Sequence, residues 1–178
     1  MDLAKSENKK KIGILGGTFD PAHRGHIIIS KEAKKRYGIN KIIWAVTKKN
    51  PYKSESTISL TKRIKYAKKI NIKNKFIKVN FYENIIKSNK TIDLIKYIKK
   101  KNKNTEIYFI MGADNLISFH KWKKSHLISS ICNILVFDRD RYKAKSLKSI
   151  GFKKYNKKSL EFIKFEKVNI SSSQLRKI

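Results

Sequence analysis

The sequence predicts an α/β protein built on a single doubly wound parallel sheet. Short apolar runs typical of strands alternate along the chain with stretches whose apolar residues have helical spacing. No internal repeat, proline-rich linker or change of composition divides the 178 residues, so one domain is expected. The glycine-rich and polar motifs follow predicted strands, and sheets of this kind bind ligands beyond the carboxyl ends of their strands. The pattern therefore predicts both the fold and the edge of the sheet that carries a site.

Six apolar runs are predicted to be strands, and they cover residues 11–15, 41–46, 76–79, 107–111, 133–137 and 161–165. Helices are predicted over residues 27–37, 60–70, 92–100 and 115–129, with a last helical turn beginning near Ser172. Within the second helix, Leu60, Ile64 and Ala67 share one face because they are spaced by four and then three residues. Ser59 and Thr91 are typical N-cap residues. Alternating elements of these lengths favour parallel βαβ units.

The terminal segment and the cysteine content indicate the compartment. Residues 1–10 are polar and lack the apolar core of a signal peptide, so they are predicted to form a flexible tail before a domain over residues 11–178. No run approaches the roughly 18 apolar residues that cross a membrane, and no membrane association is expected. Cys132 is the only cysteine, which excludes an intrachain disulfide and a cysteine-based zinc site. A cytoplasmic location fits best.

The strongly basic composition has two explanations. The formal net charge of +31 arises from 44 Lys and Arg residues against 13 Asp and Glu residues. It indicates either a polyanionic partner such as nucleic acid or a compositional bias toward Lys, Ile and Asn. We favour the second, because the lysines are dispersed and only 6 of the basic residues are Arg, the residue best suited to base readout. In either case the charge should attract anionic nucleotides and adsorb nucleic acid non-specifically.

The most informative segment runs from Gly16 to His26 and reads Gly-Gly-Thr-Phe-Asp-Pro-Ala-His-Arg-Gly-His. Two glycines at a strand exit permit a sharp turn and leave room for a ligand. His23 and His26 are expected on one face of the first helical turn, where backbone N–H groups and the helix dipole favour an anion. Imidazoles there can donate hydrogen bonds to phosphate oxygens. If His26 acts as a cation, turnover should fall as the pH rises above its pKa.

This segment resembles the (T/H)xGH superfamily of nucleotidyltransferases, and within it the nicotinate-mononucleotide adenylyltransferases. The resemblance covers residues 11–178 and implies a Rossmann-like sheet of the nucleotidylyl transferase (HUP) type. It also implies that His23 and His26 are catalytic and contact the α- and β-phosphates of ATP. The further ATP-binding residues that it implies in this segment are Gly16, Gly17, Thr18, Phe19 and Gly25.

A second motif lies at residues 170–176, Ile-Ser-Ser-Ser-Gln-Leu-Arg. Serines at a helix N-terminus offer hydroxyl and amide groups to an anion, and Arg176 would lie on the same face as Ser172 and Ser173. The segment resembles the superfamily motif Ile-Ser-Ser-Thr-x-Ile-Arg, which implies that these three residues hold the β- and γ-phosphates. Arg139, after the fifth predicted strand, resembles a basic residue that the family uses near ATP.

The middle of the chain carries the residues that the resemblance assigns to nicotinate mononucleotide. Gly112 permits a close approach at a strand exit, and Asp114 can accept hydrogen bonds from ribose hydroxyls or cap the next helix. Trp122 could stack on a pyridinium ring or belong to the core. Lys53 lies where the family has a basic residue, although Tyr52 replaces the usual His. Thr91 resembles a family Thr whose backbone N–H receives the pyridine carboxylate.

The resemblance implies transfer of the adenylyl group of ATP to nicotinate mononucleotide, a step of NAD biosynthesis, with Mg²⁺ bridging the phosphates of ATP. The acceptor phosphate is already an anionic nucleophile, so positioning and electrostatics would suffice for catalysis. No metal site made by the protein is expected, and a homo-oligomer is possible. A pantetheine-phosphate adenylyltransferase or a cytidylyltransferase of the same fold is one alternative. A non-catalytic, basic nucleic-acid-binding protein is another.

Overall fold

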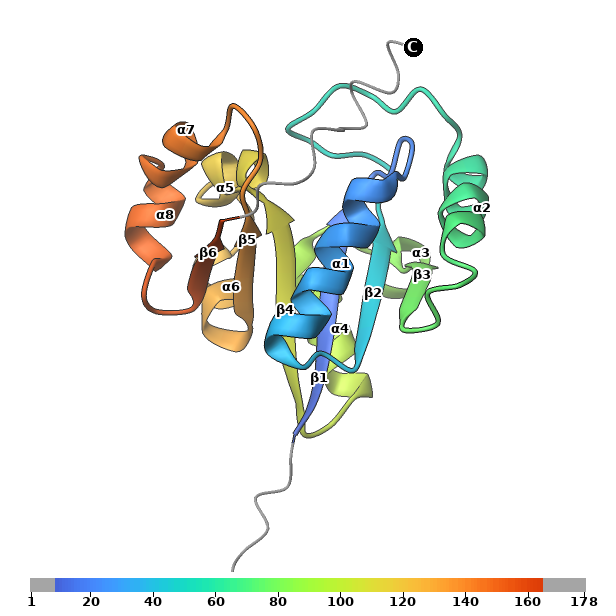
Figure 1. Cartoon of the computed structure of the whole chain (residues 1–178), viewed down its shortest axis with the longest axis horizontal. Coiled ribbons are helices and arrows are strands. Elements are labelled where there is room, and N and C mark those ends of the chain that lie inside the picture. The colour runs from blue at the N-terminus through green and yellow to red at the C-terminus, as the bar shows by residue number, and fades with distance from the viewer. Residues whose placement is uncertain (1–8, 165–178) are drawn as a thin grey trace, which may run out of the picture.

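The computed structural model describes residues 9–164 and has a sheet of six parallel strands (Figure 1). The strands are β1 (Lys10–Gly17), β2 (Lys41–Val46), β3 (Ile77–Phe81), β4 (Thr105–Gly112), β5 (Asn133–Phe137) and β6 (Leu160–Ile163). Their order across the sheet is β3-β2-β1-β4-β5-β6, and every neighbouring pair is parallel. This order confirms the predicted doubly wound fold.

Eight helices connect or follow the strands within residues 9–164. They are α1 (Arg24–Tyr37), α2 (Leu60–Ile70), α3 (Glu83–Ile86), α4 (Thr91–Lys101), α5 (Ala113–Phe119), α6 (Ser125–Ile131), α7 (Lys143–Leu147) and α8 (Ile150–Tyr155). Figure 1 shows α1 in front of the sheet and α4 behind it, so helices cover both faces. No helix in this part of the chain is long and apolar enough to cross a membrane.

The sheet divides the core into two layers because side chains alternate along each strand. In β2, Ile43 and Ala45 point into the layer formed with α4, α5, α6 and α8, whereas Ile42, Trp44 and Val46 point into the layer formed with α1 and α2. Continuous apolar runs are typical of parallel strands that are buried on both faces. Trp44 is fully buried, which confirms the prediction that it belongs to the core.

The predicted bounds hold for some elements and fail for others. The strands at 41–46 and 133–137 and the helix at 60–70 have their predicted bounds, and β1 begins one residue early, at Lys10. The prediction of one helix over residues 115–129 is wrong. Its residues form α5 and α6, separated by a turn in which Lys124 has a left-handed φ of 56°. This turn brings Trp122 against the rings of Phe109 and Phe119, so aromatic burial outweighs continuation of the helix.

The strand order fixes where a ligand can bind. The chain leaves β1 toward β2 on one side, whereas β4 continues toward β5 on the other, so the direction of winding reverses between β1 and β4. Loops on either side of such a point diverge and leave a crevice at the carboxyl edge of the sheet. The Gly16–His26 segment and the Gly112–Asp114 segment follow these two adjacent strands.

Candidate active site

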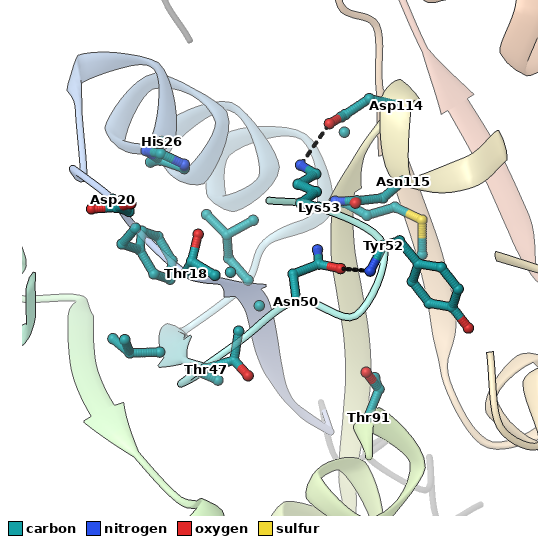
Figure 2. A pocket seen from close by; sticks show the side chains of 18 of the residues that line it. Thr18, Asp20, His26, Thr47, Asn50, Tyr52, Lys53, Thr91, Asp114 and Asn115 are labelled. Atoms are coloured by element: carbon teal, nitrogen blue, oxygen red, sulfur yellow. Dashed lines mark hydrogen bonds and ion pairs between the residues drawn. The ribbon is translucent and has the colours of Figure 1, made fainter. Parts of the chain in front are cut away.

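A cavity of about 970 Å³ lies at the carboxyl ends of the strands. Segments that follow β1, β2, β4 and β5 line it, together with α3 and the start of α4. Figure 2 shows labelled side chains from the segments after β1, β2 and β4, and from the start of α4, around one space. Every predicted site residue between Gly16 and Arg139 lines this cavity. Ser172, Ser173 and Arg176, with the predicted helical turn near Ser172, lie outside the described residues.

His23 and His26 begin helix α1 and cap it. His23 is the N-cap residue, and its Nδ1 accepts a hydrogen bond from the backbone N–H of Gly25 at 3.0 Å. The Nδ1 of His26 accepts from the backbone N–H of His23 at 3.2 Å. Because both Nδ1 atoms act as acceptors, each neutral ring carries its proton on Nε2. The two rings lie 3.9 Å apart and present two N–H donors at the cavity.

The surroundings of both histidines favour the neutral form of the ring. Burial, together with the charge of Arg139, lowers the pKa of His23 to about 4. Burial is the main cause that lowers the pKa of His26; a proton on His23 would lower it further, and the charges of Arg139 and Lys53 act in the same direction. The lowered pKa favours a neutral His26 ring that donates through Nε2, so the condition for a loss of turnover at rising pH, a cationic His26, is not favoured in the free protein. Its hydrogen-bonding role remains available without a positive charge.

Aromatic packing fixes the position of His26. The ring of Phe19 stacks on Trp44 with centroids 4.9 Å apart and contacts His26 at the same distance. Phe19 has a φ of 49°, a left-handed conformation that turns the chain after the strand. Phe19 is buried and supports His26 through its ring, and it lines the cavity together with Gly16, Gly17 and Thr18. The turn begins after Gly17, because both glycines still pair with β2.

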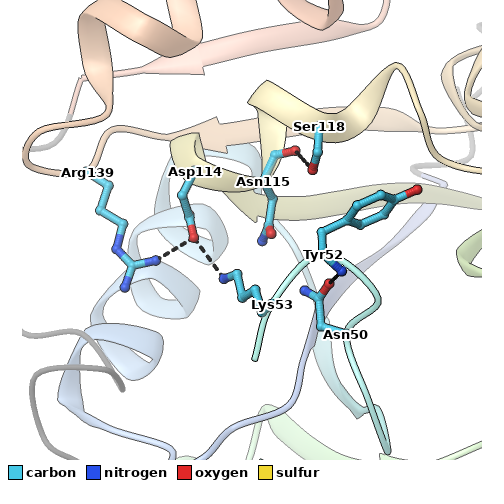
Figure 3. A network of polar contacts seen from close by, with 7 residues as sticks. All are labelled: Asn50, Tyr52, Lys53, Asp114, Asn115, Ser118 and Arg139. Carbon is cyan, nitrogen blue, oxygen red and sulfur yellow. Dashed lines mark hydrogen bonds and ion pairs between the residues drawn. The ribbon is translucent and has the colours of Figure 1, made fainter. Parts of the chain in front are cut away.

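Lys53, Asp114 and Arg139 form an ion-pair network that also lines the cavity (Figure 3). Oδ2 of Asp114 accepts from Nζ of Lys53 and from a guanidinium nitrogen of Arg139, each at 2.8 Å. Burial opposes ionisation of Asp114, but the two adjacent cations outweigh it and keep the pKa of this carboxyl below its ordinary value. Gly112 makes room for the arrangement, since a Cβ there would lie 2.6 Å from Oδ1 of Asp114.

The remaining predicted residues lie at the end of the cavity near α3 and α4. Thr91 is the first residue of α4, after an N-cap at Lys90. Trp122 is partly buried, with its ring edge-on to Phe109 and Phe119, and it also lines the cavity. Tyr52 donates from its hydroxyl to the carbonyl of Lys121 at 3.1 Å, which joins the loop after β2 to the turn after α5.

Sequence reasoning did not assign roles to Asp20 and Arg63, which hold the loops around the cavity. Asp20 is fully buried and accepts hydrogen bonds from the backbone N–H groups of Thr57 and Ile58 at 2.8 and 3.1 Å. Arg63 is 3% exposed and, among residues 9–164, donates to four backbone carbonyls. The sequence held a signal for each: Asp20 lies within the Gly16–His26 motif, and Arg63 is one of only 6 arginines.

The chain was compared with known proteins. The family model described as cytidylyltransferase-like matches residues 14–178. A probable nicotinate-nucleotide adenylyltransferase of Pelagibacter ubique is 64% identical over 173 residues, which are 97% of this chain and 96% of the relative. One of Agrobacterium fabrum is 37% identical over 72% of this chain and 68% of its own length.

A solved structure has the same fold. It is the Plasmodium falciparum nicotinic acid mononucleotide adenylyltransferase complexed with NaAD, which aligns with a TM-score of 0.73 at 22% identity over 94% of this chain and 83% of that chain.

The fold, the two histidines that line the cavity and the family match define a cytidylyltransferase-like nucleotidyltransferase. Within that class, the chain belongs to the nicotinate-nucleotide adenylyltransferase family.

Proposed function

We propose that this cavity transfers the adenylyl group of ATP to nicotinate mononucleotide, giving nicotinate adenine dinucleotide and pyrophosphate, in the cytoplasm. The observation that carries the proposal is the pair of Nε2–H donors on His23 and His26, held at the end of β1 by their own helix caps. Such donors stabilise charge on the α-phosphate as pyrophosphate leaves. The curated relatives named above support this substrate pair.

Each side of the cavity suits one substrate. On one side, Gly16, Gly17, Thr18 and Gly25 leave room for the triphosphate of ATP beside the histidines. At the other end, Thr91 and Trp122 offer a helix N-terminus and an aromatic ring, which suit a pyridine ring that carries a carboxylate. The charges of Lys53 and Arg139 lower the pKa of His26, so both cations lie close enough to attract phosphates bound beside that ring.

The reaction needs no general base, because the acceptor phosphate is ionised at neutral pH. The chain's task is to align two anionic groups and to stabilise the charge that develops between them. Mg²⁺ enters with ATP, and we expect it to bind mainly phosphate oxygens and water. Within residues 9–164, no group of three or more His, Cys, Asp or Glu side chains is placed to hold a metal. Ser172, Ser173 and Arg176 are proposed to hold the β- and γ-phosphates.

The test is to supply purified protein with ATP, Mg²⁺ and either nicotinate or nicotinamide mononucleotide, and to measure pyrophosphate and dinucleotide. We expect turnover with nicotinate mononucleotide and a smaller rate with the nicotinamide acceptor. His26→Ala should lower kcat by about 100-fold or more, as loss of a charge-stabilising donor does in other enzymes. His126→Ala, which changes an exposed histidine on α6, should leave kcat unchanged.

Two results would contradict the proposal. Absence of product with both mononucleotides would contradict the reaction, and phosphopantetheine would be the next acceptor to test. Turnover of His26→Ala at the wild-type rate would remove His26 from the chemistry.

A further inference from the structure

We propose that Arg63 is a positioning residue that sets the distance between the ATP-binding and acceptor-binding loops. The inference rests on the proposed function, because it concerns the alignment of two substrates in one cavity. Arg63 lies on α2 and does not line the cavity. Any effect on turnover must therefore pass through the loops that its guanidinium contacts.

The guanidinium of Arg63 joins three separate segments of the chain. Its NH1 group donates to the carbonyl of Thr18 at 2.5 Å and to that of Thr47 at 2.9 Å. Its NH2 group donates to the carbonyl of Lys48 at 3.1 Å, and Nε donates to that of Ile58 at 2.9 Å. Thr18 belongs to the turn before the histidines, whereas Thr47 and Lys48 follow β2 and lead into the loop that carries Lys53.

Two carboxylates hold the same segments from other sides. Asp20, two residues after Thr18, accepts hydrogen bonds from the backbone of Thr57 and Ile58. Glu83, the first residue of α3, accepts from the hydroxyl of Thr47 and from the backbone N–H of Lys48, the latter at 3.1 Å. Burial lowers the pKa of Arg63, while the charges of Asp20 and Glu83 act in the opposite direction and favour the guanidinium cation.

This geometry requires arginine and not simply a positive charge. The planar guanidinium directs several N–H donors in fixed directions, and here three nitrogens donate to four carbonyls. A lysine ammonium has three donors around one point and cannot span the same set. In Arg63→Lys the residues that line the cavity are unchanged, but the spacing between the two loops is no longer fixed. A misplacement of about 1 Å between reacting groups can cost about 100-fold in rate.

The test compares Arg63→Lys with the wild-type protein, and Arg36→Lys is the matched control. Arg36 lies on the outer face of α1 and pairs with Glu32 in an exposed ion pair. Initial rates are measured while ATP and nicotinate mononucleotide are varied in turn, and each rate is divided by the folded fraction obtained from circular dichroism. We expect Arg63→Lys to lower kcat about tenfold or more while each KM changes by less than about threefold. Arg36→Lys should match the wild type.

A wild-type kcat for folded Arg63→Lys would overturn the proposal, and so would a loss confined to KM. If Arg63→Lys does not fold, Glu83→Gln is measured instead, because it loosens Thr47 and Lys48 from the opposite side; an unchanged kcat there counts against the proposal.

If the wild type turns over neither mononucleotide, the proposed function fails separately. Amide hydrogen exchange then decides whether Arg63 positions the loops. Faster exchange at Lys48 and in residues 18–20 of Arg63→Lys, but not of Arg36→Lys, would support positioning, and equal exchange would exclude it.

Discussion

His23 and His26 each use one ring nitrogen for the fold and leave the other for chemistry. The Nδ1 atoms accept backbone N–H groups at the start of α1, where a helix has unsatisfied donors. The same two hydrogen bonds place the proton on Nε2 and orient both rings. Protonation of either Nδ1 would abolish its cap. The stability of the protein is thereby linked to the ionisation of the residues proposed for catalysis.

This link predicts acid sensitivity. Histidine in an unfolded chain titrates near pH 6.5, but the folded protein holds the pKa of His23 at about 4. Between these values the unfolded chain binds protons that the folded protein does not, so stability present above pH 6.5 is lost as the pH falls toward 4. His23→Asn keeps a good N-cap acceptor and removes one titrating ring.

We expect the Tm of His23→Asn to fall less than that of the wild type between pH 7 and pH 4.5. The difference should be about 4–8 °C, equivalent to ~2 kcal/mol at this size, because each unit of pKa difference is worth about 1.4 kcal/mol. Carboxylates contribute equally to both proteins, and His126→Asn should behave as the wild type does. Calorimetry measures the Tm of each protein at both pH values. An equal loss of Tm in His23→Asn and in the wild type would contradict the link between His23 ionisation and stability.

At the scale of residues, the local sequence predicted that the glycines and histidines lie where β1 leads into α1, because this strand, turn and helix are adjacent in sequence. It also predicted that Trp44 belongs to the core, because Trp44 lies within an apolar strand. It could not predict that Asp114 binds Lys53, which is 61 residues away, because that contact depends on how two loops fold toward each other. The neutrality of His26 was equally hidden, since burial and the charges of Lys53 and Arg139 come from the tertiary structure.

At the scale of elements, the contact between α5 and α8 supports the segment that presents Asp114. Gly151 of α8 faces α5 so closely that a Cβ there would lie 2.8 Å from the carbonyl oxygen of Leu116. A backbone atom cannot move aside as a side-chain end can, and the two helices would have to separate. The sequence of α8 shows a glycine, but it does not show what the glycine approaches. For the same reason, the break between α5 and α6 lacked a local signal: no glycine or proline lies between Phe119 and Ser125.

Gly151→Ala is therefore expected to destabilise the protein by about 1–3 kcal/mol, as overpacking does in other cores. Thermal unfolding should show a Tm several degrees below that of the wild type. Lys153→Ala, an exposed change on the same helix, serves as the control and should unfold near the wild-type temperature. An unchanged Tm for Gly151→Ala would mean that α8 can shift on α5 without cost.

At the scale of the whole molecule, the parallel sheet and the net charge contribute differently to function. The strand order collects segments from four strand ends around one cavity, and this much followed from the alternation of apolar runs. The net charge of +31, by contrast, comes from basic residues that are dispersed along the whole sequence. It should act at long range, where salt screens it, whereas contacts inside the cavity are screened less.

We therefore expect non-specific binding to double-stranded DNA to weaken by about 100-fold or more between 50 and 200 mM NaCl. Over the same range, kcat with ATP and nicotinate mononucleotide should change by less than about threefold. DNA binding is measured by fluorescence anisotropy with two labelled DNAs of unrelated sequence, and kcat is measured by pyrophosphate release. Binding that selects one sequence and resists salt would instead favour a dedicated nucleic-acid partner.

The carboxylate of Asp114 gives the cavity an internal counterion. Lys53 and Arg139 both pair with this carboxylate in the free protein, so their charges are balanced without ions from solvent. An incoming phosphate that engages either cation exchanges one anionic partner for another, and the net change of charge at that point is small. Selection among anions then depends on shape and on the number of hydrogen bonds offered, because charge alone confers little advantage over the partner already present.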